Sequence, residues 1–246
     1  MANTPEEEMF FFIADISGYT AYMLKNEMEY THGTLIVSEL IKCLVKEVQT
    51  PMEISKLEGD AVFLFLRNAA IPEEIRNDPT LLGQKILQFF TVFSHKLKEL
   101  QQSTACDCGG CSNIDKLNLK IVAHFGKAAT ETIGSFKELA GVDVIIAHRL
   151  LKNQVKEKRY LLMTESAHSR LKLPMDGKVE QWDEHDKDIG AIRVYVYYPQ
   201  QEAPVLEKKP LGFFGKLKSH FNLAIGGALL KSGLKKRPDF HNFPEK

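Results

Sequence analysis

The sequence predicts an α/β fold, an α+β sandwich in which helices pack on a sheet of mixed topology. Apolar runs of strand length recur along the chain, and several come in neighbouring pairs separated by turn residues. Amphipathic helical patterns interrupt these runs, which favours helices layered on a hairpin-rich sheet. The chain has 246 residues, of which 44% are hydrophobic, so it can bury one large core and carry an appendage.

The first elements are a strand and a helical stretch. MFFFIADI at residues 9–16 is a short apolar run, as expected of a strand buried on both faces. From residue 19 to about residue 49, the apolar positions fall at helical spacing. We expect Gly33 to separate two helices in this stretch and Pro51 to end the second one.

A hairpin and a further helix follow. MEISKL and AVFLFL are two strand patterns separated by Glu58-Gly59-Asp60, which marks a tight turn. Residues 79–101 have the continuous apolar stripe of an amphipathic helix. The remaining patterns predict strands at 116–126, 160–164, 179–182 and 191–198, and helices at 141–151 and 166–171.

Charge is distributed unevenly along a chain whose 32 basic and 32 acidic residues balance. The stretch from Lys208 to Arg237 holds 8 basic residues and no acidic one, so the remainder has 24 basic against 32 acidic residues. An acidic body argues against nucleic acid as a partner. Because the composition changes after Pro199, we divide the chain into a domain at 8–200 and a basic amphipathic tail at 201–246.

The tail places apolar residues near helical spacing between Leu211 and Leu229. A basic segment of this kind at 205–238 can lie on an anionic membrane surface, or pack on the acidic body or on a partner protein. The N-terminus is acidic and no run of about 18 apolar residues occurs. The expected location is therefore cytoplasmic, with the tail as the candidate for membrane association.

Three of the 4 cysteines, Cys106, Cys108 and Cys111, lie close together in a loop at 104–113. In a cytoplasmic protein such a cluster indicates metal ligation or reduced thiols more than disulfides. A redox switch and a loop with incidental thiols are the alternatives to a structural zinc ion. His124, in an apolar strand, is more often a hydrogen-bonded core histidine than a ligand. Zinc would need a fourth ligand, and the candidates are Asp107, His95, His124 or a residue of a second subunit.

Asp15 and Asp60 are the strongest candidates for functional residues in the sequence. Singly, Asp15 fits a helix N-cap or a buried salt bridge, and Asp60 fits an ordinary turn. If the first strand lies beside the hairpin, however, both carboxylates converge at one edge of the sheet. Two hard oxygen ligands suit Mg²⁺ or Mn²⁺, which bind carboxylates together with phosphates. Residues 17–20 then open a helix, where a triphosphate would find a ready anion site.

Several segments resemble the class III adenylyl and guanylyl cyclases. FIADISGYT is similar to their first-strand motif F-x-D-I-x-G-F-T, and KLEGDAVFLF is similar to their hairpin motif K-x-x-G-D. KIVAHFGKA, KELAGVDVIIAHRL and YLLMTESAHSRL resemble later segments in the same order, from Phe10 to Tyr198. The match is nearest to an uncharacterised bacterial branch with an added Cys-rich loop. The resemblance implies a ferredoxin-like fold with a mixed, mostly antiparallel sheet.

The resemblance also implies roles for individual residues. Asp15 and Asp60 match the aspartates that hold two Mg²⁺ or Mn²⁺ ions. Lys56 and Glu138 match the residues that recognise the purine, with Glu138 where adenylyl cyclases usually have aspartate. Arg149 matches the arginine that stabilises the transition state. The turn that would hold the phosphates matches Ile16, Ser17, Gly18, Tyr19 and Thr20.

Two positions depart from the family pattern. Ile145 stands where the family has asparagine, and Ile189 where it has a phosphate-binding lysine, with Lys187 only nearby. The function implied is cyclisation of a purine nucleoside triphosphate, with ATP favoured, to a 3′,5′-cyclic monophosphate and pyrophosphate in a homodimer. The alternative is a nucleotide-binding regulatory module of the same fold without turnover, or an adaptor recruited to a membrane or partner through its basic tail.

Overall fold

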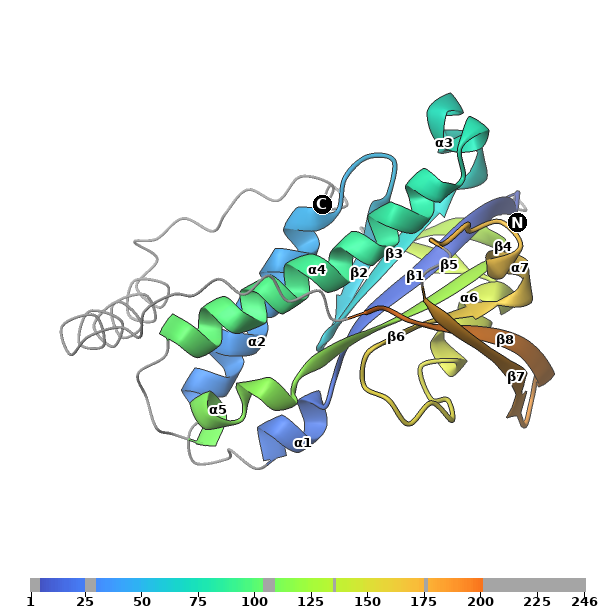
Figure 1. The fold of residues 1–246 in the computed structure, drawn as a ribbon. Helices are drawn as coiled ribbons and strands as arrows, with labels where there is room; N and C mark the ends of the chain where they lie inside the picture. Colours follow the sequence, from blue (N-terminus) through green and yellow to red (C-terminus); the bar gives the residue numbers. More distant parts are fainter. Residues whose placement is uncertain (1–4, 25–29, 104–108, 135, 175–176, 201–246) are drawn as a thin grey trace.

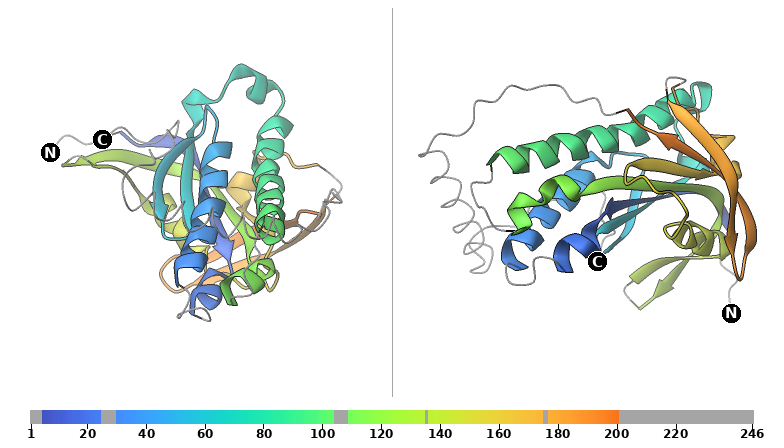
Figure 2. Two further views of the ribbon diagram at one scale, coloured as in Figure 1. Left: turned by 90° about the vertical axis from the view of Figure 1, so that its left-hand side faces the viewer. Right: turned by 60° about the horizontal axis from the view of Figure 1, so that its bottom comes forward.

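The computed structural model describes residues 5–24, 30–103, 109–134, 136–174 and 177–200. Within these residues, an eight-stranded sheet runs in the order β2-β3-β1-β4-β6-β8-β7, and β5 pairs only with β4. All of these strand pairs are antiparallel except β4–β6, which is parallel. The mixed, mostly antiparallel sheet expected from the sequence is therefore confirmed, with α2 and α4 side by side over one of its faces (Figures 1 and 2).

The strands follow the apolar runs of the sequence, and the last hairpin is longer than expected. Their bounds are β1 Glu7–Ser17, β2 Glu53–Glu58, β3 Ala61–Arg67, β4 Asn118–Ile133, β5 Phe136–Ala140, β6 Tyr160–Thr164, β7 Lys178–Asp186 and β8 Gly190–Tyr198.

The helices include two long ones, α2 and α4, and several short ones. Their bounds are α1 Tyr19–Leu24, α2 Tyr30–Glu47, α3 Glu73–Asn77, α4 Thr80–Ser103, α5 Gly109–Ser112, α6 Val142–Arg149 and α7 Glu165–His168, with 3₁₀ turns at Asn68–Ala70 and Ile114–Lys116.

Strand β1 is buried on both faces, as its continuous apolar run predicts. Its even-numbered residues from Phe10 to Ile16 join a large core with α2 and α4, which contribute Leu40 and Phe93 among others. Its odd-numbered residues from Met9 to Ile13 join a second, smaller core on the opposite face, under Ala147 of α6. Because successive side chains of a strand point to opposite faces, Asp15 projects on the α6 face.

Three local predictions were wrong or incomplete. Gly33 does not separate two helices but lies inside α2, because α1 and α2 are divided earlier in the chain. A Cβ atom on Gly33 would lie 3.4 Å from the Met23 sulfur and 3.5 Å from a ring carbon of Tyr22, which are ordinary contacts, so the packing of α1 on α2 does not require glycine here. Strand β5 and helix α3 were not expected, since each has only 5 residues and neither repeats a period long enough to detect.

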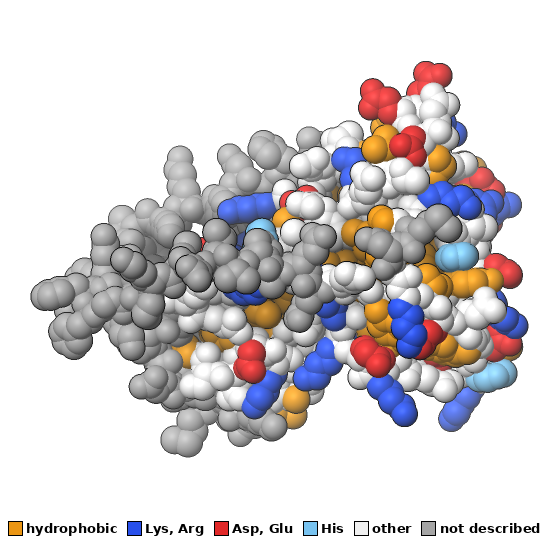
Figure 3. All heavy atoms as spheres, viewed as in Figure 1, with side chains coloured by type: hydrophobic (Ala, Val, Ile, Leu, Met, Phe, Trp, Pro, Cys, Tyr) orange, Lys and Arg blue, Asp and Glu red, His pale blue; other side chains and the backbone are white. Residues whose placement is uncertain are grey.

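Several predictions fall on residues outside the described part. Cys106, Asp107, Cys108 and the tail at 201–246 lie there, so the zinc and membrane predictions stay predictions. Cys111 belongs to α5 and packs, half-buried, against the larger core. None of the helices that the structure describes is long and apolar enough to cross a membrane. On the face seen in Figure 3, basic and acidic side chains of the described residues are interspersed.

For two helical glycines, we expect substitution by alanine to change the stability of the fold in opposite directions. A Cβ atom on Gly83 in α4 would lie 2.0 Å from the backbone oxygen of Lys172, which cannot move without shifting the chain. We expect Gly83→Ala to lower the free energy of unfolding by about 1–3 kcal/mol. Gly33→Ala, with ordinary contacts, should raise it by up to ~1 kcal/mol, because alanine favours the helix. Urea unfolding midpoints measure both, and equal stability of the two variants would contradict this packing.

Candidate active site

Asp15 and Asp60 meet at the end of β1. Asp15 lies opposite Ala61 in the β1–β3 register, one residue beyond the turn that carries Asp60. The backbone N–H of Ile16 donates to the backbone oxygen of Asp60 over 3.2 Å, which ties the strand end to the turn. Burial and, after it, repulsion by the Asp15 carboxylate and a hydrogen bond with it together raise the pKa of Asp60 to about 7. The two carboxylates expected to converge therefore lie in contact.

Lys120, a residue that the sequence analysis did not single out, partly compensates this negative charge. It lies opposite Asp15 in the β1–β4 register, and its Nζ is 3.0 Å from Asp15 Oδ2. The same Nζ donates to the backbone oxygen of Leu151 over 3.2 Å. The available signal was a lysine within the apolar strand pattern at 116–126. One ammonium group facing two carboxylates leaves the site acidic.

The donor set fits a divalent cation bound together with phosphates. Asp15 and Asp60 offer hard carboxylate oxygens, and the pKa of Asp60 is raised by burial and by repulsion from Asp15, which a cation would relieve. The described residues contain no group of three or more His, Cys, Asp or Glu side chains arranged to hold a metal ion. The remaining ligands would therefore come from backbone, water or substrate oxygens, as is usual for Mg²⁺.

The turn from Ile16 to Thr20 lies directly after Asp15. Gly18 has φ +86°, and a Cβ atom there would lie 2.8 Å from the backbone oxygen of Lys116, so the turn requires glycine. Ser17 Oγ is buried and has no hydrogen-bond partner within the described part of the chain. Lys158 Nζ donates to the same Lys116 oxygen over 3.2 Å. A polar hydroxyl and an ammonium group thus border this turn, whereas α1 behind it has only 6 residues.

The predicted base-reading residues lie together as an ion pair. Lys56 Nζ is 3.2 Å from Glu138 Oε2, across the contact between β2 and β5. The sequence did not indicate two further members of this cluster. Glu58 Oε1 is 3.3 Å from the same Nζ, and His148 Nε2 is 3.1 Å from Glu58 Oε2. Burial, the largest single contribution, lowers the pKa of Lys56, but the hydrogen bonds that its ammonium group donates to Glu138 and Glu58, with their negative charge, raise it overall.

Arg149 and Ile145 lie on the solvent side of α6. The Arg149 guanidinium group is 2.9 Å from Asp188 Oδ2 and 3.5 Å from Asp186 Oδ2, both at the β7–β8 turn. It is therefore paired with surface carboxylates instead of with Asp15 or Asp60. Ile145 is 51% exposed and presents an apolar side chain where the family resemblance places an amide.

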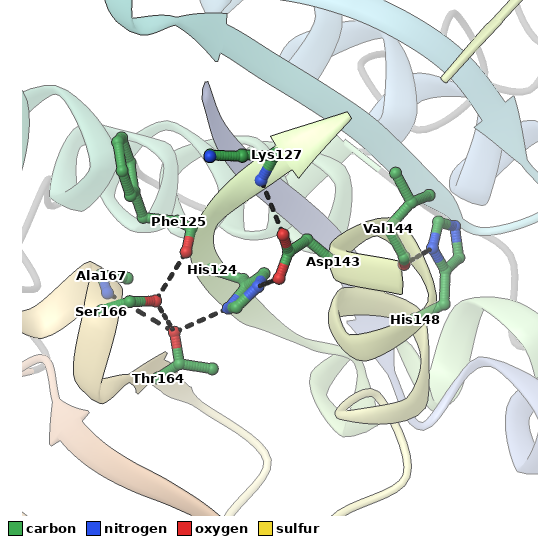
Figure 4. A network of polar contacts seen from close by, with 9 residues as sticks. All are labelled: His124, Phe125, Lys127, Asp143, Val144, His148, Thr164, Ser166 and Ala167. Carbon is green, nitrogen blue, oxygen red and sulfur yellow. Dashed lines mark hydrogen bonds and ion pairs between the residues drawn. The ribbon is translucent and has the colours of Figure 1, made fainter. Parts of the chain in front are cut away.

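A buried polar chain fixes α6 on the sheet (Figure 4). His124 Nε2 lies 2.8 Å from Asp143 Oδ1, and His124 Nδ1 lies 2.9 Å from Thr164 Oγ1. Burial lowers the pKa of His124, opposed by Asp143, which favours a neutral ring that donates to Asp143 and accepts from Thr164. The Lys127 N–H donates to the other Asp143 oxygen over 2.6 Å. His124 is thus the hydrogen-bonded core histidine that was expected.

Solved structures with a similar fold are nucleotide cyclases. A guanylyl cyclase, Cya2, has a TM-score of 0.59 at 10% identity, with 81% of this chain and 96% of that chain covered. A bacterial light-regulated adenylyl cyclase has a TM-score of 0.58 at 16% identity, with 96% and 59% covered. The adenylyl cyclase CyaB from P. aeruginosa has a TM-score of 0.56 at 15% identity, with 85% and 100% covered. Identities this low show the shared fold alone.

Sequence comparison gives a nearer relationship. An uncharacterised protein of Mycobacterium tuberculosis, Rv2561/Rv2562, is 36% identical over 114 residues, which are 46% of this chain and 50% of that protein. The chain thus matches about half the length of this relative. Residues 37–160 match the family model described as "Protein of unknown function (DUF2652)". Because that match spans half of the sequence, from α2 to the start of β6, the chain belongs to the DUF2652 family.

Proposed function

We propose that the protein binds a purine nucleoside triphosphate with Mg²⁺ or Mn²⁺ and cyclises it to a 3′,5′-cyclic monophosphate. The contact between Asp15 and Asp60 carries this proposal, because it leaves two carboxylates incompletely neutralised beside the glycine turn. The fold that places them is shared with solved adenylyl and guanylyl cyclases. Divalent cations held there would acidify the ribose 3′-hydroxyl and neutralise the triphosphate.

The reaction is an internal displacement at phosphorus. The 3′-oxygen forms a bond to the α-phosphorus, the bond from that phosphorus to the bridging oxygen breaks, and pyrophosphate leaves with the electron pair. The 3′-proton passes to solvent. Ser17 and the backbone at Gly18 would orient the phosphates, and Lys158 would add positive charge beside them. Lys56 and Glu138 would hold the base, since they offer one donor and one acceptor.

A homodimer is part of the proposal. The resemblance implies that one subunit holds the metals and the other reads the base. In support, Val142 and Ile145 on α6 are 67% and 51% exposed, so α6 presents apolar surface near the base-reading cluster. Exposed apolar side chains of this kind suit a contact with a second copy of the chain.

A binding module without turnover is the second candidate. Ile145 cannot donate a hydrogen bond, and removing one charge-stabilising donor can cost about 10²–10³ in rate. Arg149 is engaged by Asp186 and Asp188. This candidate keeps the metal and base-binding groups and predicts metal-dependent nucleotide binding without a product.

The cyclase proposal predicts product formation. The purified protein, incubated with ATP or GTP and Mn²⁺, should release a cyclic monophosphate detectable by mass spectrometry. Asp15→Asn and Asp60→Asn should each lower the rate at least about 10²-fold, because each removes a metal ligand. Asp183→Asn is the matched control, since Asp183 pairs with Arg193 on the exposed β7–β8 hairpin.

Product formed at the wild-type rate by both site variants would reject the two-carboxylate mechanism. A wild-type protein that forms no product, but whose melting temperature rises with a triphosphate only when Mn²⁺ is present, would establish the second candidate instead.

A further prediction concerns stability without metal. The pKa of Asp60 is raised from 3.8 to about 7, so its stabilising contribution is present below pH 3.8 and is lost as pH rises through 7. Asp60→Asn should therefore raise the melting temperature at pH 8 in the presence of a chelator, relative to wild type, and the gain should shrink toward pH 5. Mn²⁺ should stabilise wild type at pH 8 but not Asp60→Asn. A variant less stable than wild type at pH 8 would contradict the repulsion between the carboxylates.

A further inference from the structure

A pocket of about 360 Å³ opens between α1, α2 and the β2–β3 hairpin. Small-molecule sites in proteins usually have volumes of ~300–1,000 Å³, so this pocket can hold a small ligand. Helix α1, which lies beside the start of α2 (Figure 1), contributes Tyr19 and Met23, and the hairpin contributes Leu57 and Gly59. Except for Tyr19, which belongs to the proposed phosphate turn, the residues that line this pocket have no role in the proposed reaction.

Helix α2 presents two rows of side chains to the pocket, each with a spacing of four residues. The apolar row consists of Val37, Ile41 and Val45, and the polar row consists of Thr34, Ser38 and Lys42. Residues four apart lie one above the other on a helix, so both rows run along its axis. The helix rises by about 16 Å from residue 34 to residue 45. The wall therefore suits an elongated ligand with a long apolar part.

The apolar part of the pocket is continuous with the larger core. Val37 and Val45 belong to that core and are 7% and 2% exposed, and Met23 and Ile41 pack against it while half-buried. Leu57, by contrast, remains 44% exposed on β2. A hydrocarbon chain lying along the apolar row would remove the Leu57 side chain from water, which favours binding.

The polar row ends in a positive charge. Of the described residues that line the pocket, only Lys42 is charged. Its ammonium group donates to Glu39 Oε1 over 2.8 Å, and an ammonium group has three N–H donors, so donors remain for a ligand. The other oxygen of Glu39 lies 3.6 Å from Lys96 Nζ, so Lys42 is not the sole cation that holds this carboxylate. The matching ligand has an anionic head group.

We infer that this pocket binds an amphipathic anion, a medium-chain fatty acid, with its carboxylate on Lys42 and its chain along Ile41 and Val37 toward Met23. Such a ligand would touch both elements that carry the candidate active site. Gly59 precedes Asp60 in the hairpin turn, and Tyr19 opens α1 directly after the glycine turn. The pocket is thus an effector site, in which a bound chain holds α1 against the hairpin.

The test measures binding of octanoate, decanoate and dodecanoate to the full chain by calorimetry, without nucleotide or metal. The affinity should rise about 2–4-fold with each added CH₂ group, because each one buries further apolar surface. Decyltrimethylammonium, which has the chain of decanoate and the opposite charge, should bind about 10-fold more weakly.

Matched variants locate the head group and the chain. Lys42→Gln should lower the affinity for dodecanoate about 5-fold, whereas Lys46→Gln, exposed one turn further along α2 and outside the pocket lining, should leave it unchanged. Leu57→Trp should lower it at least about 10-fold, because the indole fills the pocket. Leu24→Trp, on α1 outside the lining, is its control, since Leu24 is 63% exposed.

Two results would overturn the inference. Equal affinities for decanoate and decyltrimethylammonium, or equal losses in Lys42→Gln and Lys46→Gln, would reject an anion and indicate an apolar docking surface for a protein segment. Undiminished binding of dodecanoate by Leu57→Trp would place the fatty acid elsewhere on the chain. Unchanged melting temperatures of the variants confirm that they fold. Since neither nucleotide nor Mn²⁺ is present, these outcomes are independent of the proposed cyclase activity.

Discussion

The burial of β1 on both faces is the constraint on which the candidate site depends. From Met9 to Ala14 every residue of the strand is at most 2% exposed, and the two faces belong to different cores. Burying a large apolar side chain stabilises the fold by roughly 1.5–3 kcal/mol. A slip of one residue would exchange the two faces and lose this fit. The register that packs the phenylalanines also sets Asp15 opposite Lys120 and next to the turn of Asp60.

The two halves of the site differ in their electrostatics. At the end of β1, two carboxylates share one ammonium group, and burial together with repulsion by Asp15 raises the pKa of Asp60. In the cluster around Lys56, one ammonium group lies between two carboxylates, and His148 contacts one of these, Glu58. Two neighbouring carboxylates favour binding of an external cation, whereas a lysine already paired with carboxylates offers both donors and acceptors of hydrogen bonds. In the proposed function, the first half binds metal and phosphate and the second binds the nucleobase.

The sequence allowed prediction of what depends on local patterns and short turns. The apolar runs located β1 and the β2–β3 hairpin, and the hairpin placed Asp60 beside Asp15 once the strands were assumed to be neighbours. Contacts between residues far apart in the sequence could not be predicted from such patterns. Glu58 and His148 are 90 residues apart, and no period in the sequence links them. Gly33 was misjudged because a glycine in a helical pattern can either end a helix or be tolerated inside it, and the pattern alone does not distinguish the two.

The choice between a protein that converts its nucleotide and one that only binds it depends on Ile145 more than on Arg149. Arg149 is paired with Asp186 and Asp188, but its side chain is 49% exposed and that of Asp188 is 71% exposed. Pairs on the surface contribute only about 0–1 kcal/mol, so a triphosphate could replace these partners at little cost. An isoleucine cannot acquire a hydrogen-bond donor in this way. A donor to the ribose or phosphate would have to come from another side chain, and Lys158, whose ammonium group borders the glycine turn, is a basic side chain placed beside the proposed phosphate site.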